Sequence, residues 1–180
     1  DWHLGQTFYE YDRREEHFHF LEWLKQQIKQ HEIDVLLIAG DVFDSPNPSA
    51  ESQRVYYRFL REVTSENPSL QIVIIAGNHD SAARLEAPNP LLEDMNIIVR
   101  GTVRRNAEGD IDLQHFIVPL YTEGKVTAYC LAVPYLRQGD YPSAENYSKG
   151  VQQLYEQLFN KVKEKGIPVV AMGHLQATGS

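Results

Sequence analysis

The sequence predicts one α/β domain with helices packed outside stacked β-sheets. Segments in which apolar residues recur at helical spacing alternate with short continuous apolar runs, which are typical of strands buried on both faces. Between residues 101 and 134 the pattern changes to short strands separated by glycine-containing turns, which favours antiparallel pairs. A chain of 180 residues is long enough to bury the core that such a domain needs.

Three segments have the apolar periodicity of amphipathic helices, namely residues 14–31, 50–65 and 151–165. Polar residues such as Lys25 and Gln26 occupy the opposite face of the first of these helices. The side chains expected to face the core are Phe20, Leu21, Leu24 and Ile28 in the first helix, Val55, Phe59, Leu60 and Val63 in the second, and Leu154, Leu158 and Val162 in the third.

Apolar runs predict the strands. Three runs are each followed directly by a glycine and predict buried strands at residues 35–39, 72–76 and 169–172. A fourth run, residues 97–99, is the last one before the change of pattern. The antiparallel part is expected to contain strands at residues 115–118 and 128–133.

Composition excludes several classes of protein. Hydrophobic residues make up 42% and charged residues 23%, which argues against a disordered chain. No apolar run approaches the roughly 20 residues of a membrane-spanning helix, so we expect no membrane partner. A single cysteine, Cys130, cannot form an intramolecular disulfide and is expected to be an inert core thiol. The formal charge of −8 means that metal ions or a partner must supply the positive charge if the chain binds phosphates.

The three glycine-ended strands each deliver side chains that can bind a metal ion. Gly40-Asp41 with Asp44 follows the first strand, Gly77-Asn78-His79-Asp80 the second and Gly173-His174 the third, and Asp1-x-His3 adds an alternating pair. Ligands in α/β proteins gather beyond the carboxyl ends of strands, so we expect these loops to converge. Asp, Asn and His favour Mn²⁺, Mg²⁺ or Fe²⁺ over zinc held by thiolates.

In their order and spacing, these motifs resemble the calcineurin-like metallophosphoesterases, and within that superfamily the SbcD family, the nuclease subunit of the SbcCD complex. The resemblance covers essentially the whole chain. It rests on Asp1-Trp2-His3-Leu4-Gly5, Gly40-Asp41-Val42-Phe43-Asp44, Gly77-Asn78-His79-Asp80-Ser81 with Arg84-Leu85, and Gly173-His174 followed by Ala177-x-Gly179.

The resemblance implies a layered sandwich of two mixed β-sheets flanked by helices, and it implies roles for the motif residues. Asp1 and His3 are expected to bind one metal ion, Asn78 and His174 a second, and Asp41 to bridge the two. His79 is implied to be catalytic and not a ligand, acting on the phosphate or on the leaving oxygen. Asp44 is open to two interpretations, as a residue that orients His79 or a ligand, or as an ordinary loop acid.

The resemblance further implies a metal-dependent DNA phosphodiesterase with two Mn²⁺ ions, or with Mg²⁺ or Fe²⁺ in their place. Its implied partners are DNA and an SbcC-type ATPase, with a homodimer of the nuclease subunit inside a heterotetramer. The implied substrates are DNA double-strand ends and hairpins, and the implied location of the protein is the cytoplasm. Two alternatives stay open: another calcineurin-like phosphoesterase acting on a cyclic nucleotide or phosphoprotein, and a scaffold that docks the ATPase but holds few metal ions.

Residues 1–180 are expected to form a metallophosphoesterase domain that is incomplete at both ends and lacks its C-terminal part. The family pattern continues to a Gly-His-x-His motif, so the last metal ligands are expected beyond Ser180. Residues 1–180 alone are therefore expected to bind metal poorly, and an inactive fragment is left open as an alternative. His17-x-His19 cannot replace this motif, because residues two apart on a helix point to different sides.

Overall fold

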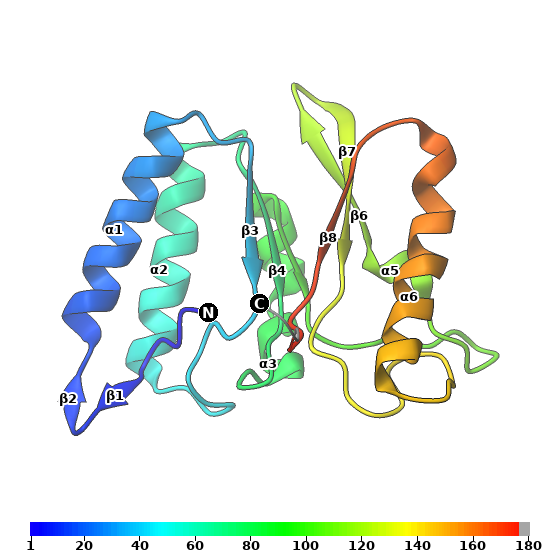
Figure 1. Cartoon of the computed structure of the whole chain (residues 1–180). Coiled ribbons are helices and arrows are strands. Elements are labelled where there is room, and N and C mark those ends of the chain that lie inside the picture. Colours follow the sequence, from blue (N-terminus) through cyan, green and yellow to red (C-terminus); the bar gives the residue numbers. More distant parts are fainter. Residues whose placement is uncertain (177–180) are drawn as a thin grey trace.

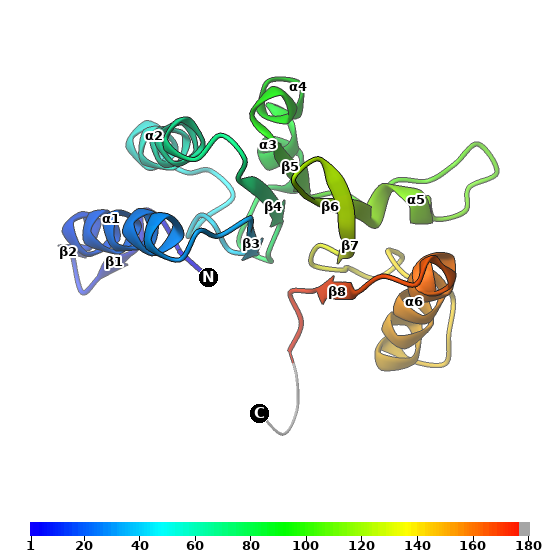
Figure 2. The same cartoon turned by 90° about the horizontal axis from the view of Figure 1, so that it is seen from above.

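The structure is a computed structural model that describes residues 1–176. Its elements form four layers: helices α1 and α2, a sheet of β3–β5, a second sheet of β6–β8, and helix α6 (Figures 1 and 2). Three clusters of buried side chains join the layers, one under α1 and α2, one between the sheets and one under α6. The layered α/β fold with helices outside stacked sheets is confirmed.

Helices α1 (Arg14–Gln30) and α2 (Ala50–Glu66) cover the outer face of the first sheet. Ser49, the residue before α2, is its N-cap: the Ser49 hydroxyl accepts a hydrogen bond from the amide of Ser52 at 3.1 Å. The two helices are linked by an ion pair of 2.8 Å between Lys25 Nζ and Glu62 Oε2. Their expected core side chains are buried or partly buried, except that Phe20 remains 37% exposed.

The first sheet contains β3 (Val35–Ala39), β4 (Gln71–Ile75) and β5 (Ile97–Arg100), all parallel and in that order. The central strand β4 is buried along its whole length. Ile72 and Ile74 face the helices, whereas Val73 and Ile75 face the second sheet, as the alternation of a strand requires.

The second sheet contains β6 (Ile117–Thr122), β7 (Lys125–Ala132) and β8 (Val169–Met172). Strands β6 and β7 are antiparallel and β8 is parallel to β7, so this sheet is mixed while the described strands of the first sheet are all parallel. Cys130 on β7 lies between the sheets, where burial raises the pKa of its thiol to about 12. It is therefore the inert core thiol that was expected.

Helix α6 (Tyr147–Val162) covers the outer face of the second sheet with Leu154 and Leu158 and continues as a 3₁₀ turn, η2 (Lys163–Lys165). It begins four residues earlier than predicted, because the side chain of Asn146 caps it by accepting a hydrogen bond from the amide of Lys149. No helix in the described part of the chain is both long and apolar enough to cross a membrane.

Several short elements are absent from the sequence prediction. They are the hairpin strands β1 (Thr7–Phe8) and β2 (Tyr11–Asp12), the helical turns α3 (Ala82–Glu86), α4 (Asn89–Leu92), η1 (Glu93–Met95) and α5 (Leu113–Phe116). The strand predicted at residues 115–118 is wrong at its start, because α5 runs to Phe116 and β6 begins only at Ile117.

Candidate metal centre

The carboxyl ends of β3, β4 and β8 meet at one edge of the sandwich, where the N-terminal segment also lies (Figure 1). The loops that follow these strands bring together Asp41, Asn78 and His174. The N-terminal segment is joined to the β3 loop by hydrogen bonds from Trp2 N and His3 N to Asp41 O, at 2.8 and 3.0 Å. The expected convergence of the motif loops therefore occurs, and it involves both sheets.

Two glycines allow the three loops to approach so closely. Gly40 has a φ of 91°, and a Cβ there would collide with the ring of His174 and with Gly77 Cα. A Cβ at Gly77 would collide with the carboxylate and the backbone nitrogen of Asp41. Glycine after β3 and after β4 is thus needed for close contact between the loops that carry the polar side chains.

One group of donor atoms gathers around His174. Its Nε2 lies 2.9 Å from Asn78 Oδ1 and 3.4 Å from Asp41 Oδ2, while its Nδ1 lies 2.9 Å from Ala39 O. A proton on Nδ1 therefore donates to the Ala39 carbonyl and leaves Nε2 facing the oxygens, the arrangement usual for a metal-binding histidine. Asp1 adds a carboxylate oxygen 3.8 Å from His174 Nδ1.

A second group lies around His3. Nitrogen and oxygen atoms of His3, Asp41 and His79 come within 4.8 Å of one another. His3 Nε2 is 3.6 Å from Asp41 Oδ2, and His3 Nδ1 is 3.2 Å from Asp44 Oδ1. The latter contact is close but poorly aligned, so the buried His3 Nδ1 has no hydrogen-bond partner among the described residues. His3 and Asp44 are therefore in close contact but share no hydrogen bond.

Asp41 belongs to both groups, as a carboxylate that bridges two ions must. It is only 4% exposed, and its Oδ2 faces nitrogens of both His3 and His174. The structure places Asp1 beside His174 and not beside His3, which differs from the pairing that the resemblance implies. Carboxylate, amide and imidazole donors fit a hard or borderline divalent ion.

His79 is exposed at the mouth of this centre. Its backbone amide donates to Asp41 Oδ1 at 2.9 Å, and its ring Nδ1 lies 2.9 Å from Asp44 O. The hydrogen bond to the Asp44 carbonyl raises the pKa of His79, an effect that desolvation opposes and the charges of Asp41, Asp44 and Asp80 reinforce. The same hydrogen bond holds the ring through Nδ1, and Nε2 makes no hydrogen bond among the described residues.

Asp80 has a structural role that the sequence analysis did not assign. Its carboxylate is 2% exposed and accepts hydrogen bonds from Gly77 N at 2.9 Å, Phe43 N at 3.0 Å and Val42 N at 3.2 Å. It therefore ties the loop after β3 to the loop after β4. The sequence signal was its place in the Gly77–Asp80 motif, but its partners lie 37 and 38 residues away.

The layered α/β fold and the cluster of metal-binding side chains indicate a metal-dependent enzyme, and comparison with known sequences identifies its family. The pattern of the family described as calcineurin-like phosphoesterase matches residues 1–180, so the chain belongs to that family. Of the residues that carried the resemblance, Ala177 and Gly179 lie outside the described part of the structure.

Within the family, the chain is similar to proteins named as the SbcD component of the SbcCD nuclease. The one from Rhodobacter capsulatus is 40% identical, over 99% of this chain and 47% of the relative. The one from Escherichia coli (strain K12) is 29% identical, over 100% of this chain and 46% of the relative. The one from Bacillus subtilis is 39% identical over 56% of this chain and 26% of the relative. The similarity to SbcD proteins is thus confirmed, and the chain spans about half the length of the first two relatives.

Proposed function

We propose that this chain carries the metal-dependent phosphodiesterase site of an SbcCD-type nuclease and hydrolyses phosphodiester bonds in DNA. The observation that carries the proposal is the buried carboxylate of Asp41, which is shared by two groups of donor atoms beside an exposed histidine. The family and the names of the relatives support a hydrolase of this kind.

The proposed ligands are Asp1, His3, Asn78 and His174, with Asp41 bridging. These residues would hold two divalent ions, with Mn²⁺ preferred over Mg²⁺ or Fe²⁺. When bound, the ions would polarise the phosphate and lower the pKa of a water molecule. The chain contributes the placement of the donors: Ala39 O orients His174, and the Asp44 carboxylate lies against His3.

His79 is the proposed catalytic residue. Because Nδ1 is held by the carbonyl of Asp44, Nε2 is the atom that hydrogen-bonds the phosphate or protonates the leaving oxygen. Its backbone bond to Asp41 fixes the distance between the catalytic side chain and the shared carboxylate. This hydrogen bond thus joins the loop of a proposed ligand, Asp41, to the loop of the proposed proton donor, His79.

The names of the relatives describe a subunit of the SbcCD nuclease, which supports a partner subunit for this chain. We propose an SbcC-type ATPase as partner, a homodimer of this chain within a heterotetramer, DNA double-strand ends and hairpins as substrates, and the cytoplasm as the place of action. The charge of −8 agrees with a protein that needs bound cations and a partner to hold DNA.

Hydrolysis assays test the proposal. The full-length protein that contains this chain, alone and with its ATPase partner, is given linear DNA, hairpin DNA, a cyclic nucleotide and a phosphopeptide, each in Mn²⁺ and in EDTA. We expect DNA cleavage that needs Mn²⁺ and is lost in His79→Leu, with Asp94→Asn as a matched surface control. Preference for the cyclic nucleotide or the phosphopeptide indicates another phosphoesterase. Partner binding without hydrolysis indicates a scaffold. Either result contradicts the proposal.

A further inference from the structure

The loop of residues 133–146 connects β7 to α6 and passes beside the metal centre. Within it, Leu136 is 2% exposed and packs in the cluster under α6, whereas its neighbours Tyr135 and Arg137 are both exposed. We infer that Tyr135 and Arg137 form a binding subsite for the polynucleotide strand next to the scissile phosphate. This inference rests on the proposed function and names the residues that hold its substrate.

The subsite adjoins the metal centre directly. Tyr135 N donates to Ala76 O at 2.8 Å, and Ala76 immediately precedes the loop that carries Asn78. The rings of Tyr135 and His174 lie 6.3 Å apart, centroid to centroid, with their planes at 80°. An exposed aromatic ring thus lies next to a proposed ligand.

A small polar pocket lies between this loop and the metal-binding loop. It has a volume of about 190 Å³ and is lined by Gly77, Asp80, Thr102, Tyr135 and Arg137, among others. Within residues 1–176, no ion pair or side-chain hydrogen bond engages the guanidinium of Arg137; only its backbone amide is bound, to Asp140 Oδ2 at 2.8 Å. The structure therefore presents a cation and an aromatic face together at the edge of the centre.

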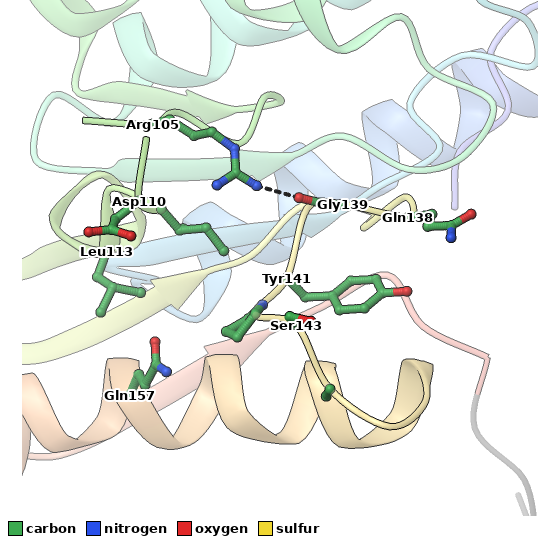
Figure 3. A pocket seen from close by; sticks show the side chains of 11 residues that line it. Arg105, Asp110, Leu113, Gln138, Gly139, Tyr141, Ser143 and Gln157 are labelled. Carbon is green, nitrogen blue, oxygen red and sulfur yellow. Dashed lines mark hydrogen bonds between the residues drawn. The ribbon is translucent and has the colours of Figure 1, made fainter. Parts of the chain in front are cut away.

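The loop is held in place from its other side (Figure 3). The guanidinium of Arg105 donates to the carbonyls of Gly109 and Gly139 and so ties this loop to the turn before α5. Close packing of Tyr141 against Gly150, where a Cβ would collide with the ring, adds a second anchor. The larger pocket there, of about 760 Å³, is lined by Arg105, whose guanidinium already donates to backbone carbonyls and is not free to bind a phosphate. Arg105 instead holds the loop in place before a substrate binds.

The chemistry of the two exposed side chains fits a single strand of nucleic acid. A tyrosine ring stacks on any base, and an arginine pairs with a phosphate oxygen, so the pair recognises a polynucleotide without reading its sequence. In a chain of net charge −8, a cation at this position matters more than one on a distant face. A small phosphodiester without a neighbouring nucleoside has nothing to place on Tyr135.

The test compares Tyr135→Ala and Arg137→Ala with the conservative variants Tyr135→Phe and Arg137→Lys. Binding of a fluorescein-labelled phosphorothioate oligonucleotide is measured by anisotropy in Mn²⁺. The ratio kcat/KM is measured for an oligonucleotide and for methyl p-nitrophenyl phosphate, which has only a methyl group in place of the neighbouring nucleoside. We expect each alanine variant to weaken oligonucleotide binding about tenfold. The ratio of kcat/KM between oligonucleotide and small diester should fall by a similar factor, and Tyr135→Phe should bind like the wild type. Tyr121→Ala and Arg61→Ala, at exposed sites elsewhere, are the controls.

Mn²⁺ affinity separates a subsite from a structural support of His174. Alanine variants that bind the oligonucleotide as the wild type does overturn the inference and leave the proposed function standing. Variants that lose Mn²⁺ affinity in parallel show that the loop positions the ligand, which also overturns it. A wild type that hydrolyses the small diester but cleaves no DNA contradicts the proposed function instead, and the anisotropy measurement still decides the subsite.

Discussion

Asp41 and His3 both adopt left-handed backbone conformations, with φ of 48° in each. For residues other than glycine such conformations cost about 1–3 kcal/mol each and persist only where the surroundings enforce them. Here the carbonyl of Asp41 accepts hydrogen bonds from Trp2 N and His3 N, so the two strained residues hold each other. Strain at two proposed ligands agrees with a site whose geometry is set before a metal ion binds.

His79 offers the sharpest separation of catalysis from metal binding. In His79→Leu, turnover on DNA should fall by about 10²–10⁴, the usual contribution of a general acid or base. Mn²⁺ affinity measured by calorimetry should stay unchanged, because the side chain is proposed not to bind the ion. The exposed His19→Leu serves as the control. Loss of an ion in His79→Leu moves this residue into the ligand set, which its distance from His3 and Asp41 permits.

Asp80 should matter for stability and for metal binding together. Asp80→Ala leaves three buried amides without an acceptor, so the free energy of unfolding should fall by about 3 kcal/mol or more. Because two ligand loops separate, Mn²⁺ affinity should fall about 10–100-fold. Urea unfolding and calorimetry measure the two effects, with exposed Asp94→Ala expected within about 0.5 kcal/mol of the wild type. Unchanged Mn²⁺ affinity in Asp80→Ala contradicts this role.

Asp41, Asn78 and His174 were predictable from sequence because each follows an apolar run and a glycine, which are local signals, whereas Asp1 and His3 were marked only by their alternating spacing. The roles of Asp80 and Tyr135 were not predictable in this way. Asp80 acts on amides 37 and 38 residues earlier in the chain, and Tyr135 reaches Ala76 and His174 across the junction of the sheets. Only the three-dimensional structure brings these partners together.

Among the elements, length decided what the sequence could predict. Helices α1, α2 and α6 repeat their periodicity often enough to be recognised, and the buried strands are marked by continuous apolar runs. The short turns α3 to α5 and the β1–β2 hairpin are too brief for a period and depend on tertiary contacts. Asn89 in α4, for example, bonds both the amide and the carbonyl of Val99 on β5, at 3.1 and 3.0 Å.

A partly buried carboxylate joins three of these elements. Glu86 at the end of α3 accepts hydrogen bonds from Gly101 N and from Thr102 N and Oγ1 after β5, and its Oε1 lies 3.5 Å from His115 Nε2 in α5. Burial alone would raise the pKa of Glu86, but the interaction with His115 and the hydrogen bonds from Thr102 and Gly101 lower it to about 2. The ionised form therefore stabilises this corner of the fold.

The depressed pKa makes the stability of the domain depend on pH. Because the folded pKa of Glu86 is about 2 and its ordinary value is 4.5, its stabilisation is present above pH 4.5 and is lost as the pH falls toward 2. In urea unfolding, Glu86→Gln should be less stable than the wild type by about 3 kcal/mol at neutral pH. The difference should shrink progressively below about pH 4.5. A difference that stays constant down to about pH 3 contradicts the proposed ionisation.

At the scale of the whole molecule, the candidate centre lies where the two sheets meet. Asp41 and Asn78 follow strands of the first sheet, and His174 follows a strand of the second. The contacts between Asn78, Asp41 and His174 therefore cross from one sheet to the other. An ion bound there should stabilise the whole sandwich, because it favours the folded chain over the unfolded one.

The most direct test of this account is a Mn²⁺ titration of the full-length wild-type protein and of its Asp41→Ala variant, monitored by calorimetry and by thermal unfolding. The wild type should bind Mn²⁺ saturably and unfold at a higher temperature with it. Asp41→Ala should bind at least about 100-fold more weakly and gain no stability from Mn²⁺, because both groups of donors lose their shared carboxylate. Asp94→Ala should behave as the wild type does. Equal Mn²⁺ affinity in Asp41→Ala and the wild type would contradict the shared-carboxylate centre.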